Sequence, residues 1–468
     1  MADPGGAASP PRPDGARDPA GVRLPSRLAR RRPRGLGQPR HDAPRAAVRR
    51  REVSPRAPPR DDPRHRAARV RREQLLASRA PALETDGRSP LDAARKLVPQ
   101  IRSCADEIEA KRELPRPLFE AMADAGLFHL AVPRAIGGGE LDLPTYVQVI
   151  EEIGKADAST GWCLNQGAIF GTYAARMPRE VARTIWIDTP RAVVANTPAA
   201  TAKAIVVPGG YRVTGRQGFS TGCRHAAWVA AHAQIIENGQ VRLEGDQPEA
   251  RYMFVPVGEA ELLDTWHTRG MRGTGTHHFA VNNAFVPTER TVLSQTAPLI
   301  ENAPLYRIPR TLLFASGDAA VALGMARTCL ETFGELAGAK TPRAMQALLR
   351  DQPMVQLSVG QAEAHLRSGR AFLFEAVREI WAASVNGAIT LDHRANLRLA
   401  ATHGIRLAAQ IIDSVYNAAG ATAAYDDHLL QRHFQDIHVI TQHLQGRLAH
   451  YELVGRYSLG LKIDEARL

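Results

Sequence analysis

Apolar residues recur every three to four positions from Leu91 onward, which is the period of an amphipathic α-helix. Leu97, Ile101, Ala105 and Ile108 mark the first such stretch. Glycines and prolines separate it from three further predicted helices, at 116–125, 143–155 and 173–189. The pattern therefore predicts a helical region at the start of the folded part of the chain.

Near Arg191 the period of the apolar residues changes to two, which is typical of β-strands. Asn238-Gly239 has the sequence of a tight hairpin turn. A second alternating, glycine-rich segment, Asp264–Thr276, is also predicted to be β structure. The other predicted strands cover 193–197, 204–207, 211–220, 228–236, 241–244 and 252–257.

The helical period returns after Pro287, and we predict no strand beyond that residue. Four long amphipathic stretches follow, the number expected of a four-helix bundle, at 308–336, 353–384, 394–419 and 428–457. The sequence thus predicts an α+β protein in four parts. These are a tail at 1–88, an N-terminal helical domain at 89–190, a middle β domain at 191–298 and a C-terminal helical bundle at 299–468.

The tail differs from the rest of the chain in composition. Residues 1–72 hold twenty arginines, no lysine and seven acidic residues, a net +13, so the remainder of a chain with +12 overall carries −1. Because the tail has few large apolar side chains, it cannot offset its ordering entropy, and we predict that it is disordered. The arginine-rich composition of the tail has two explanations, a start codon placed too early or a basic arm that binds nucleic acid or anionic lipid. Since the body is nearly neutral, we expect no nucleic-acid partner.

The four cysteines, Cys104, Cys163, Cys223 and Cys329, lie far apart without paired spacing, which predicts neither disulfides nor a structural zinc site. No segment has the composition of a secretory signal, and no apolar run reaches the length of a membrane span. The sequence accordingly predicts a reduced, cytoplasmic protein with no membrane partner and no metal.

Three segments carry a resemblance to a known family, namely Gly210–Gly222, Trp266–Thr276 with the following Phe285–Arg290, and Asp436–His443. The first two resemble the flavin-contacting β domain of the acyl-CoA dehydrogenase superfamily. The third resembles the branch of two-component flavin-dependent monooxygenases that hydroxylate aromatic compounds. The resemblance runs from about Leu91 to Leu459. It implies the acyl-CoA dehydrogenase fold, whose order of helices, β domain and four-helix bundle agrees with the pattern above.

The resemblance implies that reduced FAD or FMN is the cofactor. Thr221 corresponds to the residue whose hydroxyl faces flavin N5, and Gly420 resembles a glycine turn that approaches the flavin phosphate from a neighbouring subunit. The other implied flavin contacts are Ser220, Gly222, Arg272, Gly273 and Thr274. By itself, Thr221 equally suits a strand-end threonine bonded to its own backbone. Gly273-Thr274-Gly275 lacks the third glycine of a dinucleotide fingerprint, so we expect no nicotinamide site.

His443 is the candidate for acid–base chemistry. On a continuous helix, Asp436 and His443 share one face about 10 Å apart, because seven residues make nearly two turns. In the branch that this spacing resembles, the histidine faces the phenol of the substrate, and a side chain of this type suits transfer of a phenolic proton. Otherwise His443 is a bundle histidine satisfied by a neighbour. Trp162 resembles a residue that lines the site, and it equally suits the core.

We therefore predict the oxygenase component of a two-component monooxygenase, which takes reduced flavin from a separate reductase and hydroxylates a small aromatic compound with O2. The alternative is an FAD-containing acyl-CoA dehydrogenase, which needs a carboxylate base. The resemblance to that family implies a glutamate directly before a glycine in this C-terminal region, but 441–446 contains no acid. In members that carry the base on the first bundle helix, Asp318 would be the corresponding base, or a lining residue of the site, whereas Glu331 and Glu335 are predicted on the helix surface. A catalytically inactive binding or assembly subunit is a third possibility. The shared flavin site of the family and the apolar bundle predict a homotetramer, or at least a dimer.

Overall fold

The computed structural model describes residues 89–468, and the predicted disorder of 1–88 lies outside that part of the chain. The described chain begins with the helices α2 (Pro90–Ser103), α3 (Ala105–Lys111), α4 (Arg116–Asp124), α5 (Leu143–Ala156), α6 (Ala158–Phe170) and α7 (Arg179–Trp186). The prediction of a single helix over 173–189 was wrong. A 3-10 turn, η3 (Gly171–Arg176), comes first, and α7 starts only after Pro178, which has no backbone N–H to continue a helical ladder.

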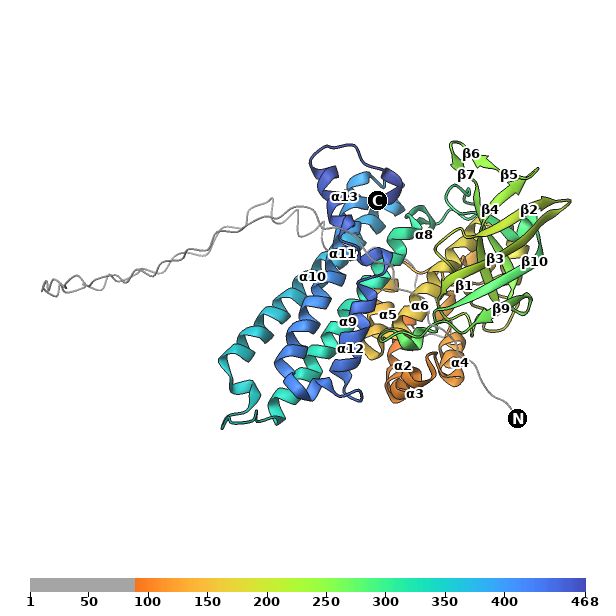
Figure 1. Ribbon diagram of the computed structural model, residues 1–468. Helices are drawn as coiled ribbons and strands as arrows, with labels where there is room; N and C mark the ends of the chain where they lie inside the picture. Colours follow the sequence, from red (N-terminus) through yellow and green to blue (C-terminus); the bar gives the residue numbers. More distant parts are fainter. Residues whose placement is uncertain (1–88) are drawn as a thin grey trace, which may run out of the picture. The chain divides into compact units, whose positions relative to one another are not determined.

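A nine-stranded sheet follows, with the order β11-β8-β4-β2-β3-β10-β9 and with β1 and β5 also paired to β4 (Figure 1). Its strands are β1 (Val194–Asn196), β2 (Ala202–Val207), β3 (Gly210–Ser220), β4 (Trp228–Glu237), β5 (Gln240–Val241), β8 (Ala250–Pro256), β9 (Ala260–Leu263), β10 (His277–Pro287) and β11 (Thr291–Leu293). A small ribbon joins β6 (Leu243–Glu244) to β7 (Gln247–Pro248). The two pairs β1–β4 and β2–β4 are parallel, and the others are antiparallel.

Two expectations about the strands were wrong. The segment 264–276 is not a strand but a loop around the 3-10 turn η5 (Arg272–Thr274). Met271 and Gly275 flank this turn with φ of 51° and 50°, a left-handed conformation that cannot continue a strand. The expectation that no strand follows Pro287 was also wrong. The short strand β11 (Thr291–Leu293) pairs with β8 at the edge of the sheet.

The C-terminal region contains three long helices, α9 (Arg310–Ala339), α10 (Pro353–Val385) and α11 (Leu391–Ala419), preceded by the short α8 (Pro304–Arg307). The fourth predicted helix is interrupted. It consists of α12 (Leu429–Ile440), the 3-10 turn η9 (Leu444–Gly446) and α13 (Ala449–Ser458). His443 lies in the break with an extended backbone (φ −65°, ψ 154°), so the helical spacing assumed between Asp436 and His443 was wrong.

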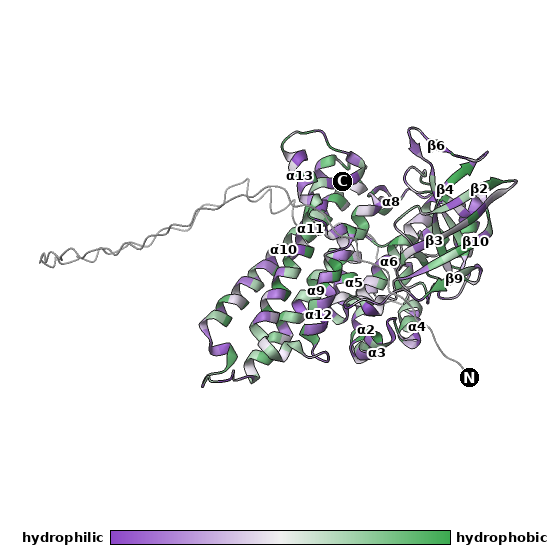
Figure 2. Cartoon of the chain, viewed as in Figure 1, coloured by the Kyte–Doolittle hydropathy of each residue, from purple (hydrophilic) through white to green (hydrophobic). Residues whose placement is uncertain are grey.

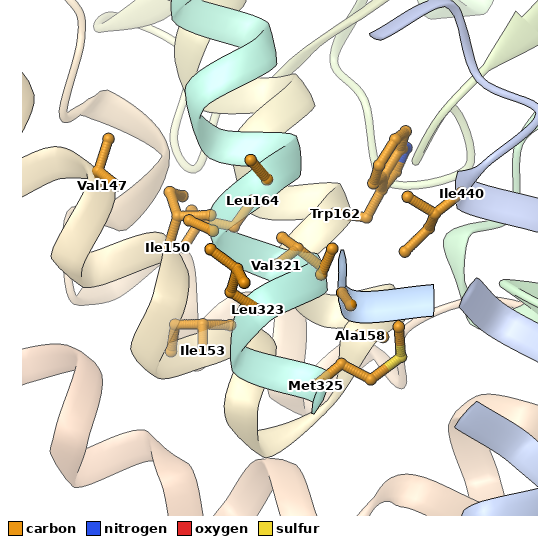
Figure 3. Packing of buried hydrophobic residues seen from close by; sticks show 14 of the residues in the cluster. Val147, Ile150, Ile153, Ala158, Trp162, Leu164, Val321, Leu323, Met325 and Ile440 are labelled. Atoms are coloured by element: carbon orange, nitrogen blue, oxygen red, sulfur yellow. The ribbon is translucent and has the colours of Figure 1, made fainter. Parts of the chain in front are cut away.

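Glycines let three helices pack closely at the centre of the described unit. A Cβ added to Gly161 of α6 would lie 2.7 Å from the Cα of Gly154 in α5, and one added to Gly154 would lie 2.8 Å from the Cα of Val321 in α9. Figure 3 shows Val321 within the apolar cluster of this junction, with Trp162 at its edge beside Ile440. Because α6 also packs against β1 and η5, it connects the bundle to the sheet (Figure 1).

Hydrophilic and hydrophobic residues alternate along the bundle helices, as Figure 2 shows for α10. The first half of α10 leaves large apolar side chains exposed, among them Met354 (70% exposed) and Leu357 (52%). Within residues 89–468, no helix is long and apolar enough to cross a bilayer.

Candidate active site

Two groups of side chains, each of which includes candidates predicted from the sequence, lie on α6 or close to it. We call them the histidine side, which consists of His443, Asp318, Trp162, Asn165 and Gln166, and the threonine side, which consists of Thr221, Thr274, Thr276, Phe219 and Trp266. The two are connected through consecutive residues of α6. Trp162 contacts His443, and the thiol of Cys163 lies 3.6 Å from the backbone oxygen of Thr274.

His443 pairs with Asp318 on the histidine side. Its Nδ1 lies 3.2 Å from Oδ2 of Asp318, at a distance suited to an ion pair but without the alignment of an ideal hydrogen bond. The ring stands edge-on to Trp162, with centroids 4.9 Å apart. The imidazole is 35% exposed while Asp318 is completely buried. The pair joins His443, which the sequence analysis assigned to a monooxygenase, with Asp318, which it assigned to an acyl-CoA dehydrogenase. Because Nδ1 faces Asp318, Nε2 is the ring nitrogen that does not face it.

Asp318 is surrounded by donors from α6. Its Oδ1 accepts hydrogen bonds from the amides of Asn165 (2.9 Å) and Gln166 (3.2 Å). The oxygen of the Asn165 amide in turn accepts from the hydroxyl of Tyr146 at 2.9 Å, which fixes the orientation of the amide. A buried carboxylate is costly unless it is paired and hydrogen-bonded, and these contacts supply both. Burial and the charge of Asp318 raise the pKa of Tyr146, so this hydroxyl keeps its proton.

A buried arginine adds positive charge near Asp318. Arg398 of α11 is 1% exposed and donates to Thr311 at 2.8 Å and to the side chain of Gln445 in η9. Burial lowers the pKa of Arg398 to about 10, and the charge of Asp318 opposes that shift. Because Gln445 follows His443 by two residues, this contact also holds the break between α12 and α13.

The threonine side is a chain of hydroxyls at the end of β3. Thr221 Oγ1 lies 3.0 Å from Thr276 Oγ1, which lies 2.7 Å from Thr274 Oγ1. Thr274 donates to the backbone oxygen of Met271 at 2.8 Å. Thr221 is thus not bonded only to its own backbone, because its hydroxyl contacts a residue 55 positions later in the sequence.

Two aromatic residues beside Thr221 were missed as site residues by the sequence analysis. Phe219 is 62% exposed, and its φ of 59° is unusual for an aromatic residue. Its ring lies 6.4 Å from that of Trp266, whose indole N–H donates to the oxygen of Met271. The sequence pointed to a site role for these residues only through their position inside the glycine-rich segments. The positive φ of Phe219 could not be predicted, because phenylalanine rarely adopts that conformation.

Of the other predicted flavin contacts close to Thr221, Gly222, Arg272 and Gly273 have structural contacts within the protein, whereas the hydroxyl of Ser220 has no hydrogen-bond partner among the described residues. Ser220 is completely buried. The backbone N–H of Gly222 donates to the oxygen of Thr274, and Arg272 pairs with Glu109 at 2.8 Å. Gly273 is required for packing, because a Cβ there would lie 2.0 Å from the side chain of Ile108.

Asp436 and Gly420, the other two residues singled out from the sequence, belong to neither the histidine side nor the threonine side. Asp436 is buried, accepts from the backbone N–H of Met271 at 2.5 Å and lies 3.4 Å from His433, so it anchors the η5 loop to α12. Gly420 ends α11 with a φ of 62°, and Lys340 binds the preceding carbonyl oxygen of Ala419 at 2.6 Å.

Glu331 and Glu335 are exposed on α9, as predicted. Two surface hollows, of about 290 and 420 Å³, are lined in part by α13 and include no residue of either group.

Comparison with known proteins identifies the family. Residues 88–186 match the N-terminal domain of acyl-CoA dehydrogenases, and residues 316–447 match a C-terminal domain of the same family. The chain is 30% identical over 344 residues to an indole-3-acetate monooxygenase of Pseudomonas putida, which covers 73% of this chain and 86% of that protein. The chain belongs to the acyl-CoA dehydrogenase superfamily.

The chain is also similar to a protein named as an oxygenase subunit and to a solved structure of the same fold. The oxygenase subunit HsaA of a flavin-dependent monooxygenase from Mycobacterium tuberculosis is 26% identical, over 81% of this chain and 97% of its own. The structure of XiaF from Streptomyces sp. in complex with FADH2 and glycerol has the same fold, with a TM-score of 0.74 and 24% identity over 85% of this chain and 98% of that one. This acyl-CoA dehydrogenase superfamily member is a flavin-dependent monooxygenase-like oxidoreductase, as the sequence predicted.

The threonine side of this superfamily member fits a flavin. A flat heterocycle with polar edges needs hydrogen-bonding groups and an apolar surface, and here the partly buried hydroxyl of Thr221 lies close in sequence to the exposed ring of Phe219. Gly222 next to them has a φ of 67° and open space where a side chain would be. The end of β3 therefore offers the kinds of group that a flavin ring system needs, a hydroxyl and an exposed aromatic ring.

A cluster of carboxylates lies behind the loop of η5. Burial and the nearby charge of Asp436 raise the pKa of Glu109 to about 7, and Arg272 only partly offsets this effect. Asp157, which caps α6 by accepting from the backbone of Thr160 at 2.7 Å, has a pKa raised by burial. The loop that holds the threonine side is thus backed by groups whose charge depends on pH.

Proposed function

We propose that this protein is the oxygenase component of a two-component system that hydroxylates a small aromatic compound bearing a hydroxyl group. In the overall reaction one atom of O2 enters the substrate as a hydroxyl and the other leaves as water, while reduced flavin supplies two electrons and two protons and becomes oxidised. The observation that carries the proposal is the pair of His443 and Asp318, with the imidazole partly exposed and the carboxylate fully buried.

His443 is the proposed acid–base residue. With Nδ1 directed at Asp318, Nε2 is free to accept the proton of a substrate hydroxyl, which leaves the electron pair on the substrate oxygen and enriches the aromatic ring in electrons. Asp318 fixes the ring orientation, and its carboxylate lies against the nitrogen opposite the one that would take the proton. Trp162 provides an apolar wall against which an aromatic ring can pack.

The burial of Asp318 also argues against the acyl-CoA dehydrogenase alternative. A base that removes a proton from a thioester substrate must reach that substrate, whereas Asp318 is 0% exposed and shares its oxygens with two amides and an imidazole. Glu331, the next carboxylate along α9, is exposed and lies 3.6 Å from Lys155.

We further propose that Thr221 contacts flavin N5 and that Phe219 and Trp266 contact its rings. The cofactor is reduced FMN or FAD, which when bound would donate two electrons to O2. A separate reductase is the expected partner, because the relatives include a protein named as an oxygenase subunit.

A homotetramer, or at least a dimer, would bring a second copy's Gly420 to the flavin phosphate. Light scattering at micromolar concentration tests this assembly, and a monomer would contradict it.

The function is tested by supplying the full-length protein with reduced FMN or FAD, O2 and a panel of phenols and indoles, with product analysis by mass spectrometry. A parallel reaction contains acyl-CoA thioesters and an artificial electron acceptor. We expect oxygenated products from phenols and no thioester oxidation. Thioester oxidation without any oxygenated product would overturn the proposal in favour of the dehydrogenase.

A further inference from the structure

The three hydroxyls of the threonine side form a chain whose direction follows from proton counting. A threonine hydroxyl carries one proton and can donate one hydrogen bond. Thr274 uses its proton on the backbone oxygen of Met271, since a carbonyl can only accept. In the 2.7 Å contact between Thr274 and Thr276, Thr276 must therefore donate. In the 3.0 Å contact between Thr276 and Thr221, the donor must then be Thr221.

The end of this chain is held in place. The oxygen of Met271 also accepts from the indole of Trp266 at 2.9 Å, and the N–H of Met271 donates to the buried Asp436. Thr274 is 1% exposed and Thr276 is 6% exposed, so water does not offer them alternative partners. The proton of Thr221 is consequently directed inward, and its oxygen presents only lone pairs to a ligand.

We propose that Thr274 and Thr276 are positioning residues that make Thr221 an obligate acceptor, and that the site thereby selects reduced over oxidised flavin. The inference rests on the proposed contact between Thr221 and flavin N5. Reduced flavin carries a hydrogen at N5 and can donate it to Thr221. Oxidised flavin has a lone pair at N5, which would face the lone pairs of Thr221 without a proton between them.

Such selection serves an enzyme that exchanges flavin with a partner. The site binds the reduced flavin that a reductase supplies, and it binds the oxidised product of turnover more weakly. Because the discrimination comes from a fixed arrangement of neutral hydroxyls, it requires no movement of the protein and no change in protonation.

The test is Thr276→Val in the full-length protein, with dissociation constants measured separately for oxidised flavin and, without oxygen, for reduced flavin. The valine removes the acceptor of Thr221, whose hydroxyl can then rotate and donate to oxidised N5. We expect oxidised flavin to bind about two- to tenfold more tightly, the range for one hydrogen bond, with little change for reduced flavin. Thr221→Val should instead weaken the binding of reduced flavin.

The lower preference of Thr276→Val for reduced flavin should also change the midpoint potential of the bound flavin. A tenfold fall in the preference for reduced flavin lowers the potential by about 30 mV for a two-electron couple. Thr276→Ser keeps a hydroxyl and should retain the wild-type preference. Thr291→Val is the matched control, because Thr291 is a buried threonine of β11 whose hydroxyl donates to the backbone oxygen of Thr288 and takes no part in the chain from Thr221.

An unchanged ratio of the two dissociation constants in a folded Thr276→Val protein would overturn the inference. Loss of the preference in Thr276→Ser would do the same, since the effect would then come from packing and not from the hydroxyl. A wild-type protein that binds flavin in neither redox state would instead contradict the proposed function itself.

Discussion

The two sides of α6 differ in the protons that they can exchange. On the threonine side every hydroxyl proton in the chain from Thr221 to Thr274 has a fixed acceptor, and the groups are neutral. On the histidine side a partly exposed imidazole lies against a buried carboxylate, so one ring nitrogen is held by Asp318 and the other can face a substrate. The comparison suggests a division of roles in which one side binds a cofactor in one redox state and the other moves a proton of the substrate.

The largest effect is expected for His443→Ala. Loss of acid–base assistance should lower the rate of hydroxylation by roughly 10²–10⁴-fold, while the binding of reduced flavin stays near normal. Stopped-flow turnover and equilibrium binding measure the two quantities. The matched control is His438→Ala, which removes an exposed histidine of α12 that pairs with Asp413. A similar loss of flavin binding in His443→Ala would break the division of roles.

Asp318→Asn should have the next largest effect. It retains the shape of the side chain but removes the charge that orients the imidazole of His443, and we expect hydroxylation to fall by about ten- to a hundredfold. Glu335→Gln removes an exposed carboxylate from the same helix and serves as the control. If Asp318→Asn retained full activity, the pairing with His443 would be structural only.

Gly317→Ala tests how the histidine side is built. A Cβ at this position of α9 would lie 2.0 Å from Oδ1 of Asn165, so the amide that binds Asp318 would have to move. We expect the free energy of unfolding to fall by about 1–3 kcal/mol, as measured by urea denaturation. Gly334→Ala, on the same helix with open space around it, should instead stabilise the protein by up to about 1 kcal/mol. Equal effects would show that Gly317 has no special packing role.

The smallest effect concerns Glu109, behind the threonine side. Because its pKa is raised from 4.5 to about 7 in the folded protein, the stability that it contributes is complete below about pH 4.5 and is lost as the pH rises through 7. The melting temperature of Glu109→Gln relative to wild type should therefore increase from pH 5 to pH 8. Glu107→Gln, on the same helix, controls for loss of a carboxylate. A constant difference would contradict the raised pKa.

The periodic parts of the chain were predictable, because long amphipathic helices and alternating strands repeat a signal over many residues. The local exceptions were not. The break after Ile440 depends on the distant contact between Gln445 and Arg398, and the loop at 264–276 depends on the bond between Met271 and Asp436.

The resemblance pointed to Thr221 and His443 as single residues. It could not indicate that Asp318 pairs with His443, since 125 positions separate them and the packing of α9 against α12 and η9 brings them together. Nor could it indicate the direction of the hydrogen bonds from Thr221 to Thr274, which follows from the geometry of the η5 loop.

The central claim is that this flavin-dependent oxidoreductase inserts oxygen from O2 into a substrate aligned with His443. Its most direct test is a single turnover of the full-length protein, loaded with one equivalent of reduced flavin and a phenol, in the presence of ¹⁸O2. The account predicts one ¹⁸O atom in the organic product of the wild type and a strongly reduced yield of that product from His443→Ala. Product oxygen derived from water, or an unchanged yield from His443→Ala, would contradict it.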